Sequence, residues 1–194
     1  GSSSLLRDGY KNARHAHTLI FMIFGMALLL GLFVISRYNY LLFHTVAELF
    51  SIAVAWSVFL LVWNVRRFMK NDALFFLGIS YVFIGSVDLL HTLAYKGMNV
   101  FPVADSSNLA TQLWIVARWL EAAALLLFPL FLGRRLHPRI LLGLFTSVTA
   151  VLLASIFSWD VFPVCFTRET GLTPFKVWSE YAICLVILAA IVLL

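Results

Sequence analysis

The sequence predicts an all-α fold, a polytopic helical bundle that spans a membrane. Of its 194 residues, 62% are hydrophobic and only 12% are charged, whereas about a quarter of a soluble domain is charged. The hydrophobic residues form continuous blocks of roughly the 20 residues that a helix needs to cross a bilayer. Because a backbone in lipid must satisfy its own hydrogen bonds and the blocks do not alternate, helices are expected rather than strands.

Six spans are expected in order along the chain. The first apolar run lacks a small-residue cleavage site, so we interpret it as a membrane anchor and not as a signal peptide. The fourth run follows Asn108, which is a suitable N-cap. The sixth is still apolar where the sequence ends. The expected spans cover residues 18–35, 41–65, 73–93, 109–131, 140–157 and 175–194.

The basic residues of the connections predict the orientation. Short cytoplasmic loops carry an excess of Lys and Arg, and here nine basic residues lie on one side and four on the other. We therefore expect a multi-pass protein of the inner (cytoplasmic) membrane with a cytoplasmic N-terminus. The net charge of +5 is explained in this way, and no nucleic-acid partner is expected. The nine are Arg7, Lys11, Arg14, Arg66, Arg67, Lys70, Arg134, Arg135 and Arg139, and the four are Arg37, Lys96, Arg168 and Lys176.

Ionisable side chains inside the spans are few and are expected at similar depth. Each costs about 2.5–3.5 kcal/mol at the centre of a membrane helix, so it must face protein, water or a ligand. With the predicted orientation, the polar groups of three spans fall in the outer half of the membrane. We expect one outward-facing polar pocket with Thr92 and Tyr95 at its mouth. Its lining would comprise His44 and Glu48 from the second span, Asp88 and His91 from the third, and Trp114, Arg118 and Glu121 from the fourth.

The charge of this pocket is unbalanced. Three carboxylates accompany one arginine, which leaves a charge of −2 if both histidines are neutral. A desolvated cluster favours a proton, charged histidines or a divalent cation in that situation. We predict a zinc or iron ion, because His, Asp and Glu are their common ligands. The predicted metal ligands are His44, Glu48, Asp88 and His91, and the predicted ligand-binding residues are Trp114, Arg118, Glu121, Thr92 and Tyr95.

Two other interpretations of the same residues stay open. A haem b could be held between His44 and His91, which lie at similar depth and would serve as two axial ligands. A purely structural network, satisfied by water and backbone groups, would also explain polar residues in a bundle. In that network Arg118 and Glu121 form a plain ion pair with a spacing of three residues.

Three segments together resemble the MASE3 family, a bacterial and archaeal membrane-associated sensor domain. They are Phe43–Glu48, Asp88–Met98 and Thr111–Glu121, and the resemblance extends over residues 41–194. It implies a sensory input module, itself not an enzyme, that regulates a cytoplasmic histidine kinase or diguanylate cyclase in the same chain, often through PAS domains. We interpret residues 1–16 as a tag remnant (Gly1–Ser4) and a cytoplasmic N-terminus. Residues 17–194 are the sensor domain, expected to be C-terminally incomplete and homodimeric in the bilayer.

Functions of other classes use similar residues. A membrane transport or redox protein that conducts ions or protons also carries carboxylates and histidines in its helices. Such a path needs ionisable groups at all depths, and the inner halves of the spans are nearly free of them. A membrane hydrolase could use a metal ion to activate water, but the sequence has no His-Glu-x-x-His motif.

The orientation can be tested by cysteine labelling with an impermeant reagent in intact cells. A cysteine at position 105 should react and one at position 70 should not, because residues 96–108 are expected outside and 65–72 inside. Preferential labelling at position 70 would reverse the predicted topology.

Overall fold

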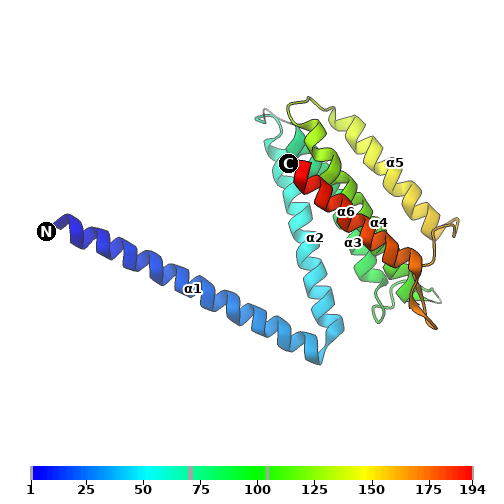
Figure 1. Cartoon of the computed structure of the whole chain (residues 1–194), viewed down its shortest axis with the longest axis horizontal. Coiled ribbons are helices and arrows are strands. Elements are labelled where there is room, and N and C mark those ends of the chain that lie inside the picture. Colours follow the sequence, from blue (N-terminus) through cyan, green and yellow to red (C-terminus); the bar gives the residue numbers. More distant parts are fainter. Residues whose placement is uncertain (1, 70–71, 104, 194) are drawn as a thin grey trace. The chain divides into compact units, whose positions relative to one another are not determined.

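The structure is a computed structural model that describes residues 2–69, 72–103 and 105–193, with side chains from residue 17 onward. Six of the described helices are long and apolar enough to cross a membrane. This confirms the predicted all-α membrane bundle (Figure 1). The elements are α1 (Ser2–Tyr38), α2 (Tyr40–Val65), α3 (Ala73–Ala94), α4 (Ser106–Leu127), the 3-10 turn η1 (Phe128–Phe131), α5 (Pro138–Phe157), β1 (Phe166–Thr167), β2 (Gly171–Leu172) and α6 (Pro174–Leu193).

Some residues used to predict the orientation lie outside this description. Lys70 is among them, as are the side chains of Arg7, Lys11 and Arg14. The interpretation of Gly1 as the start of a tag remnant also falls there. The orientation therefore stays a prediction.

Most predicted boundaries agree with the structure, but the start of α4 differs. The helix begins at Ser106 because Asp105 caps it: its Oδ1 accepts from the backbone N–H of Ser107 and of Asn108. The expectation that Asn108 is the N-cap was wrong. Its side-chain oxygen instead accepts from the backbone N–H of Cys165 at 2.8 Å and of Phe166 at 3.0 Å. Both residue types make good caps, and the packing of the 158–173 connection decides between them.

The 158–173 connection contains the described strands. β1 and β2 pair antiparallel, with Phe166 opposite Leu172 and Thr167 opposite Gly171. Gly171 has a φ of 77°, which a glycine adopts at no steric cost. After β2, the Thr173 hydroxyl donates to the carbonyl of Val164 at 2.7 Å. These hydrogen bonds hold the connection together, and the Asn108 side chain attaches it to the start of α4 by accepting from the backbone N–H groups of Cys165 and Phe166.

The chain divides into two compact units, residues 1–46 and 47–194. In the first unit, the apolar part of α1 from His17 to Tyr38 has no buried residue among those described. Its side chains are large and apolar, as lipid contact requires. The hydrophobic surface belongs to the predicted first span.

The second unit is built around α3 and α4, which lie side by side (Figure 1). α6 packs on α4, and α5 packs on α3. Aromatic rings fill the contacts of α3 with α5 and with η1. Phe83 stacks on Phe145 of α5 with ring centroids 5.7 Å apart, and the ring centroids of Phe76 and Phe131 of η1 are 4.5 Å apart. Such aromatic pairs stabilise a fold by more than the burial of their apolar area alone. The most buried large side chains, including Phe76, Ile79 and Leu113, come from α3 and α4.

Two glycines allow α2 to approach α3 closely. A Cβ added to Gly78 would lie 3.0 Å from the Val62 side chain, and one added to Gly85 would lie 3.1 Å from the Trp56 ring and 3.2 Å from Ala55. Small residues play this role at many membrane helix contacts because they let two backbones pack closely. The spacing of seven residues places both glycines on one face of α3.

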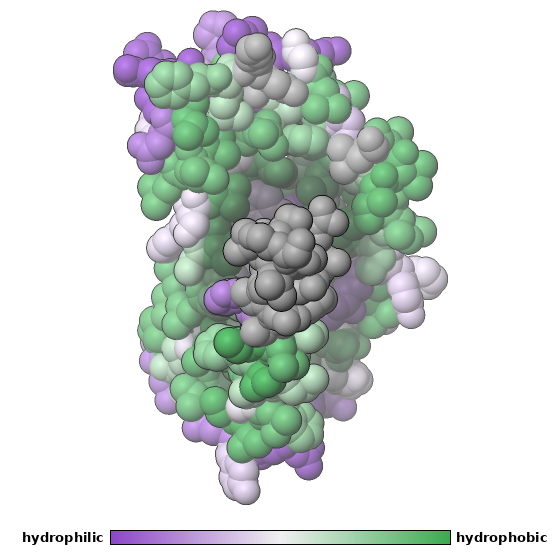
Figure 2. Space-filling view, turned by 90° about the vertical axis from the view of Figure 1, so that its left-hand side faces the viewer, coloured by the Kyte–Doolittle hydropathy of each residue, from purple (hydrophilic) through white to green (hydrophobic). Residues whose placement is uncertain are grey.

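The surface matches a membrane environment. Figure 2 shows hydrophobic residues over most of the visible face and hydrophilic residues gathered at its upper and lower ends. Exposed leucines, isoleucines and phenylalanines are also found on α5 and α6. Such a distribution suits a protein whose middle contacts lipid and whose ends contact water.

The close contact at Gly85 predicts that a large side chain there destabilises the domain more than the same side chain at Gly143. Gly85→Leu should destabilise the domain by about 1–3 kcal/mol, because an added side chain would collide with Trp56 and overpack the contact. Gly143→Leu on α5 is the matched control, since a Cβ there meets nothing within 4 Å. Unfolding in detergent measures both. Equal stability of the two variants would contradict the close approach of α2 and α3.

Candidate functional site

A buried ion pair joins α3 to α4. Asp88 is 5% exposed, and its Oδ2 lies 2.6 Å from Arg118 Nη2. The other terminal nitrogen of Arg118, Nη1, donates to Glu121 Oε2 at 2.5 Å. The expected pair of Arg118 with Glu121 is thus confirmed, and the guanidinium is shared with Asp88. One cation serves two carboxylates, which leaves this trio with a formal charge of −1.

His91 is fixed by a backbone group of α4. The side chain is 6% exposed, and its Nδ1 lies 2.8 Å from the carbonyl oxygen of Ala110. A carbonyl only accepts, so Nδ1 is the protonated nitrogen. In the neutral ring, Nε2 then carries the lone pair and can bind a metal ion. Metal-binding histidines are oriented in this way, by a hydrogen bond from the other ring nitrogen.

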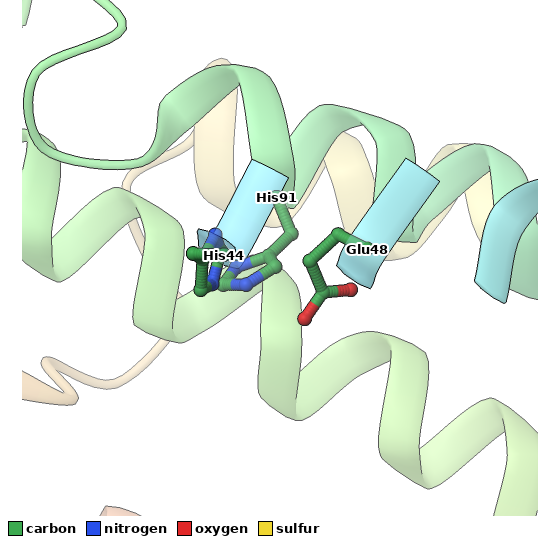
Figure 3. Close-up of side chains that lie close together, drawn as sticks. All are labelled: His44, Glu48 and His91. Atoms are coloured by element: carbon green, nitrogen blue, oxygen red, sulfur yellow. The ribbon is translucent and has the colours of Figure 1, made fainter. Parts of the chain in front are cut away.

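Glu48 approaches His91 from α2. A carboxylate oxygen of Glu48 and a ring nitrogen of His91 lie within 4.8 Å of one another. Figure 3 shows these two side chains reaching toward each other from their helices, and it also labels His44 of α2. His44 precedes Glu48 by one helical turn on the continuous helix α2, so the two side chains share a face. The three side chains are one possible His/Glu/His metal group within the described part of the chain.

The structure separates the other predicted pocket residues. Asp88 contacts Arg118 and is not one of the three possible metal ligands. Thr92 does not lie at a mouth, because it is only 1% exposed and its hydroxyl donates to the carbonyl of Asp88 at 2.8 Å. Threonine commonly satisfies its hydroxyl on the preceding turn of a membrane helix. Trp114 faces α6, where Lys176 Nζ lies 4.7 Å from its ring centroid.

Two cavities flank these residues. One, of about 280 Å³, lies among α2, α3 and α4; Asp88, Arg118 and Glu121 line it together with apolar residues. The Oδ1 of Asp88 has no hydrogen-bond partner among the described residues. The other cavity, of about 290 Å³, is lined by His91 and Tyr95 with residues of α4 and the β-hairpin. The polar groups of α2, α3 and α4 therefore divide between an ion pair network and a possible metal group.

The sequence model of the MASE3 membrane-associated sensor domain matches residues 35–194. The chain belongs to the MASE3 family. This confirms the resemblance carried by the three sequence segments, all of which lie inside the match. The match supports a sensory input role and not an enzymatic one, and with six apolar helices it supports a multi-pass membrane protein. Neither a curated protein nor a solved structure matches the chain significantly.

The MASE3 domain also contains polar contacts that the sequence did not reveal. Gln112 of α4 donates to the carbonyls of Phe162 and Pro163, at 3.2 and 3.1 Å. Lys176, which we counted among the basic residues of the outer side, is 9% exposed, and its Nζ lies 2.5 Å from Glu180 Oε1. The spacing of four residues between a lysine and a glutamate was a usable signal for this pair.

Cys165 is a buried thiol in the same region of the MASE3 domain. Burial raises its pKa to about 11, an effect that the nearby Lys176 opposes. The thiol is therefore protonated at neutral pH, and a protonated thiol is a poor nucleophile. Its Sγ lies 3.5 Å from the carbonyl of Pro163. Cys165 has a structural role, consistent with the absence of a cysteine pattern in the sequence.

Because Arg118 pairs with both Asp88 and Glu121, removing Arg118 and removing Glu121 should affect stability unequally. Arg118→Ala should destabilise the domain by about 3–5 kcal/mol, because it leaves Asp88 buried without a cation. Glu121→Ala should cost less, since Arg118 would still pair with Asp88. Arg168→Ala is the control: this side chain is 76% exposed and 3.7 Å from Asp105, and exposed pairs contribute about 0–1 kcal/mol. Thermal unfolding in detergent compares the three, and normal folding and signalling of Arg118→Ala would contradict this role of Arg118.

Proposed function

We propose that this MASE3 domain is a metal-responsive input module. A divalent zinc or iron ion would bind to His44, Glu48 and His91, and its occupancy would regulate a cytoplasmic histidine kinase or diguanylate cyclase in the same chain. The observation that carries the proposal is the hydrogen bond from His91 Nδ1 to Ala110. It assigns the ring proton to Nδ1, so Nε2 would be the nitrogen that binds a metal ion, and the three side chains offer ligand atoms within 4.8 Å of one another.

The ligand types suit either metal. Two ligands that each lie about 2.0–2.1 Å from a tetrahedral ion are about 3.3 Å apart. The ligand atoms of the three side chains, which lie within 4.8 Å of one another, would therefore have to move closer together when an ion binds. Three protein ligands leave a fourth position open, which is typical of sites that exchange ligands rather than of closed structural sites. Asp88 is not among the proposed ligands, because its Oδ2 pairs with Arg118 and it is not one of the three side chains of the possible metal group.

Charge also favours a divalent cation. The ion pair trio carries −1 and Glu48 adds a second negative charge nearby, with both histidines neutral. An ion of charge +2 would make the cluster neutral, which lowers the cost of burying it. The flanking cavities, of about 280 and 290 Å³, are at the lower end of the size of small-molecule pockets, which is about 300–1,000 Å³.

The position of the proposed ion suggests how occupancy could be transmitted. Glu48 belongs to α2 and His91 to α3, so the ion would join two helices that otherwise meet through glycines and apolar side chains. Asp88 and His91 in turn hold α3 to α4. An ion shifts a conformational equilibrium only if it binds two arrangements unequally. The proposal therefore requires a second packing of α2 on α3.

The cellular setting belongs to the same proposal. The nine-to-four bias of basic residues supports a pocket that opens to the outside and an N-terminus in the cytoplasm of the inner membrane. The kinase or cyclase effector rests on the family alone, and a homodimer is the expected assembly. In that arrangement the domain would report an extracytoplasmic metal ion to the cell interior.

Metal content tests the proposal. Protein purified without chelator should contain close to one zinc or iron ion per chain by mass spectrometry. The content should fall in His44→Ala, Glu48→Ala and His91→Ala, because each removes a ligand, and should persist in the control His137→Ala. Asp88→Asn should also keep the ion, since Asp88 is not a ligand.

Two outcomes would contradict the metal site. One is a well-folded protein that is metal-free after purification without chelator and after incubation with zinc or iron. The other is full occupancy in His91→Ala. A Soret band that is lost in His44→Ala and His91→Ala but kept in Glu48→Ala would show that a haem is bound instead.

A further inference from the structure

A groove of about 600 Å³ lies where α2 ends and α5 begins. This end of the domain is opposite to the end of α3 that carries His91 and Tyr95. One wall is formed by Trp63 and Arg66, from the end of α2 and the residue after it. The other wall comes from His137 and the first turns of α5, including Arg139, Ile140 and Leu142.

The groove is strongly basic. The two connections at this end and the first turn of α5 contain five described arginines and one described acidic residue, Asp72. That aspartate is already engaged, because one carboxylate oxygen accepts from the Leu136 backbone N–H at 2.8 Å and the other lies 3.8 Å from Arg135. No ion pair joins Arg66 or Arg139 to an acidic side chain in the described part of the chain. The positive charge of the groove is therefore left for an outside partner.

An aromatic ring holds one of these arginines in place. The guanidinium carbon of Arg66 lies 4.2 Å from the centroid of the Trp63 ring, and its Nη1 donates to the Trp63 carbonyl. A guanidinium held by a ring face loses less conformational freedom when it binds an anion. Tryptophan at this depth is also typical of the membrane–water interface.

The other side of the groove is apolar. Ile140 is 68% exposed, and with Leu142 it continues the groove onto the apolar surface of α5. A partner must therefore combine a negative head with a hydrocarbon part. Arginine recognises phosphate oxygens through its fork of N–H donors, and basic grooves between membrane helices bind anionic lipid head groups.

We propose that this groove binds an anionic phospholipid. Arg66 and Arg139 contact the phosphodiester, and an acyl chain lies against Ile140 and Leu142. The lipid then bridges the end of α2 and the start of α5, which line the two walls of the groove. The inference does not depend on the proposed metal site, because it uses different residues at the other end of the helices.

Native mass spectrometry of the full chain in detergent can measure this binding, with phosphatidylglycerol and phosphatidylcholine as probes. Phosphatidylglycerol should bind more tightly. The double variant Arg66→Gln/Arg139→Gln should weaken its binding about 25-fold, since a basic residue contributes roughly 1 kcal/mol, or about fivefold, to binding an anionic lipid. The control Lys96→Gln/Arg168→Gln removes the same charge from the opposite end and should leave the affinity within about twofold of the unchanged chain.

Three results would overturn the proposal. The first is equal weakening by the control pair, which would show a dependence on net charge alone. The second is equal affinity for phosphatidylcholine. The third is binding of sn-glycerol 3-phosphate as tightly as phosphatidylglycerol, which would make the groove a site for free phosphate esters.

A conservative pair keeps the test valid if the glutamine pair does not fold. Arg66→Lys/Arg139→Lys keeps both charges but removes the planar fork and the stacking on Trp63. It should weaken phosphatidylglycerol binding severalfold and leave phosphatidylcholine binding unchanged. An unchanged affinity for phosphatidylglycerol in this variant would also overturn the proposal.

Discussion

The ion pair of Asp88 with Arg118 is the constraint on which the rest of the bundle depends. A carboxylate buried among apolar helices needs a cation, and the cation can come only from a helix that packs beside it. Asp88 meets this need through the 2.6 Å contact with α4. The pair fixes how α3 is rotated against α4. His91, three residues further on, then faces the Ala110 carbonyl on the same helix.

The second constraint is the close approach of α2 to α3. Gly78 and Gly85 leave room for Val62 and Trp56, so the two backbones pack closely along one face. This approach brings Glu48 to His91, whose ring tautomer is set by its bond to α4. Neither contact alone would assemble the polar cluster. A tight glycine interface and a buried ion pair together position a carboxylate beside an oriented imidazole.

Both proposed ligands involve α2, at its two ends. Glu48 lies near its start, and Trp63 with Arg66 lies at its end. Glu48 adds to the excess negative charge of the cluster of Asp88, Arg118 and Glu121, whereas the end of α2 lines a groove with excess positive charge. A metal ion would hold the start of α2 to α3, and a lipid would hold its end to α5. For a member of a sensor family, this makes α2 the helix whose packing the two ligands would control together.

The sequence by itself determined the all-α fold, the six spans, the family, and the pair of Arg118 with Glu121. Each depends on composition or on spacing within one helix, which periodicity fixes. The tertiary structure alone decided that Asp88 pairs with Arg118 and does not join His91, and that Asp105 rather than Asn108 caps α4. It also placed Trp114 against α6. The physical reason is that spacing gives the face a residue occupies on its own helix. Which neighbour that face meets depends on how the helices are rotated and packed against one another.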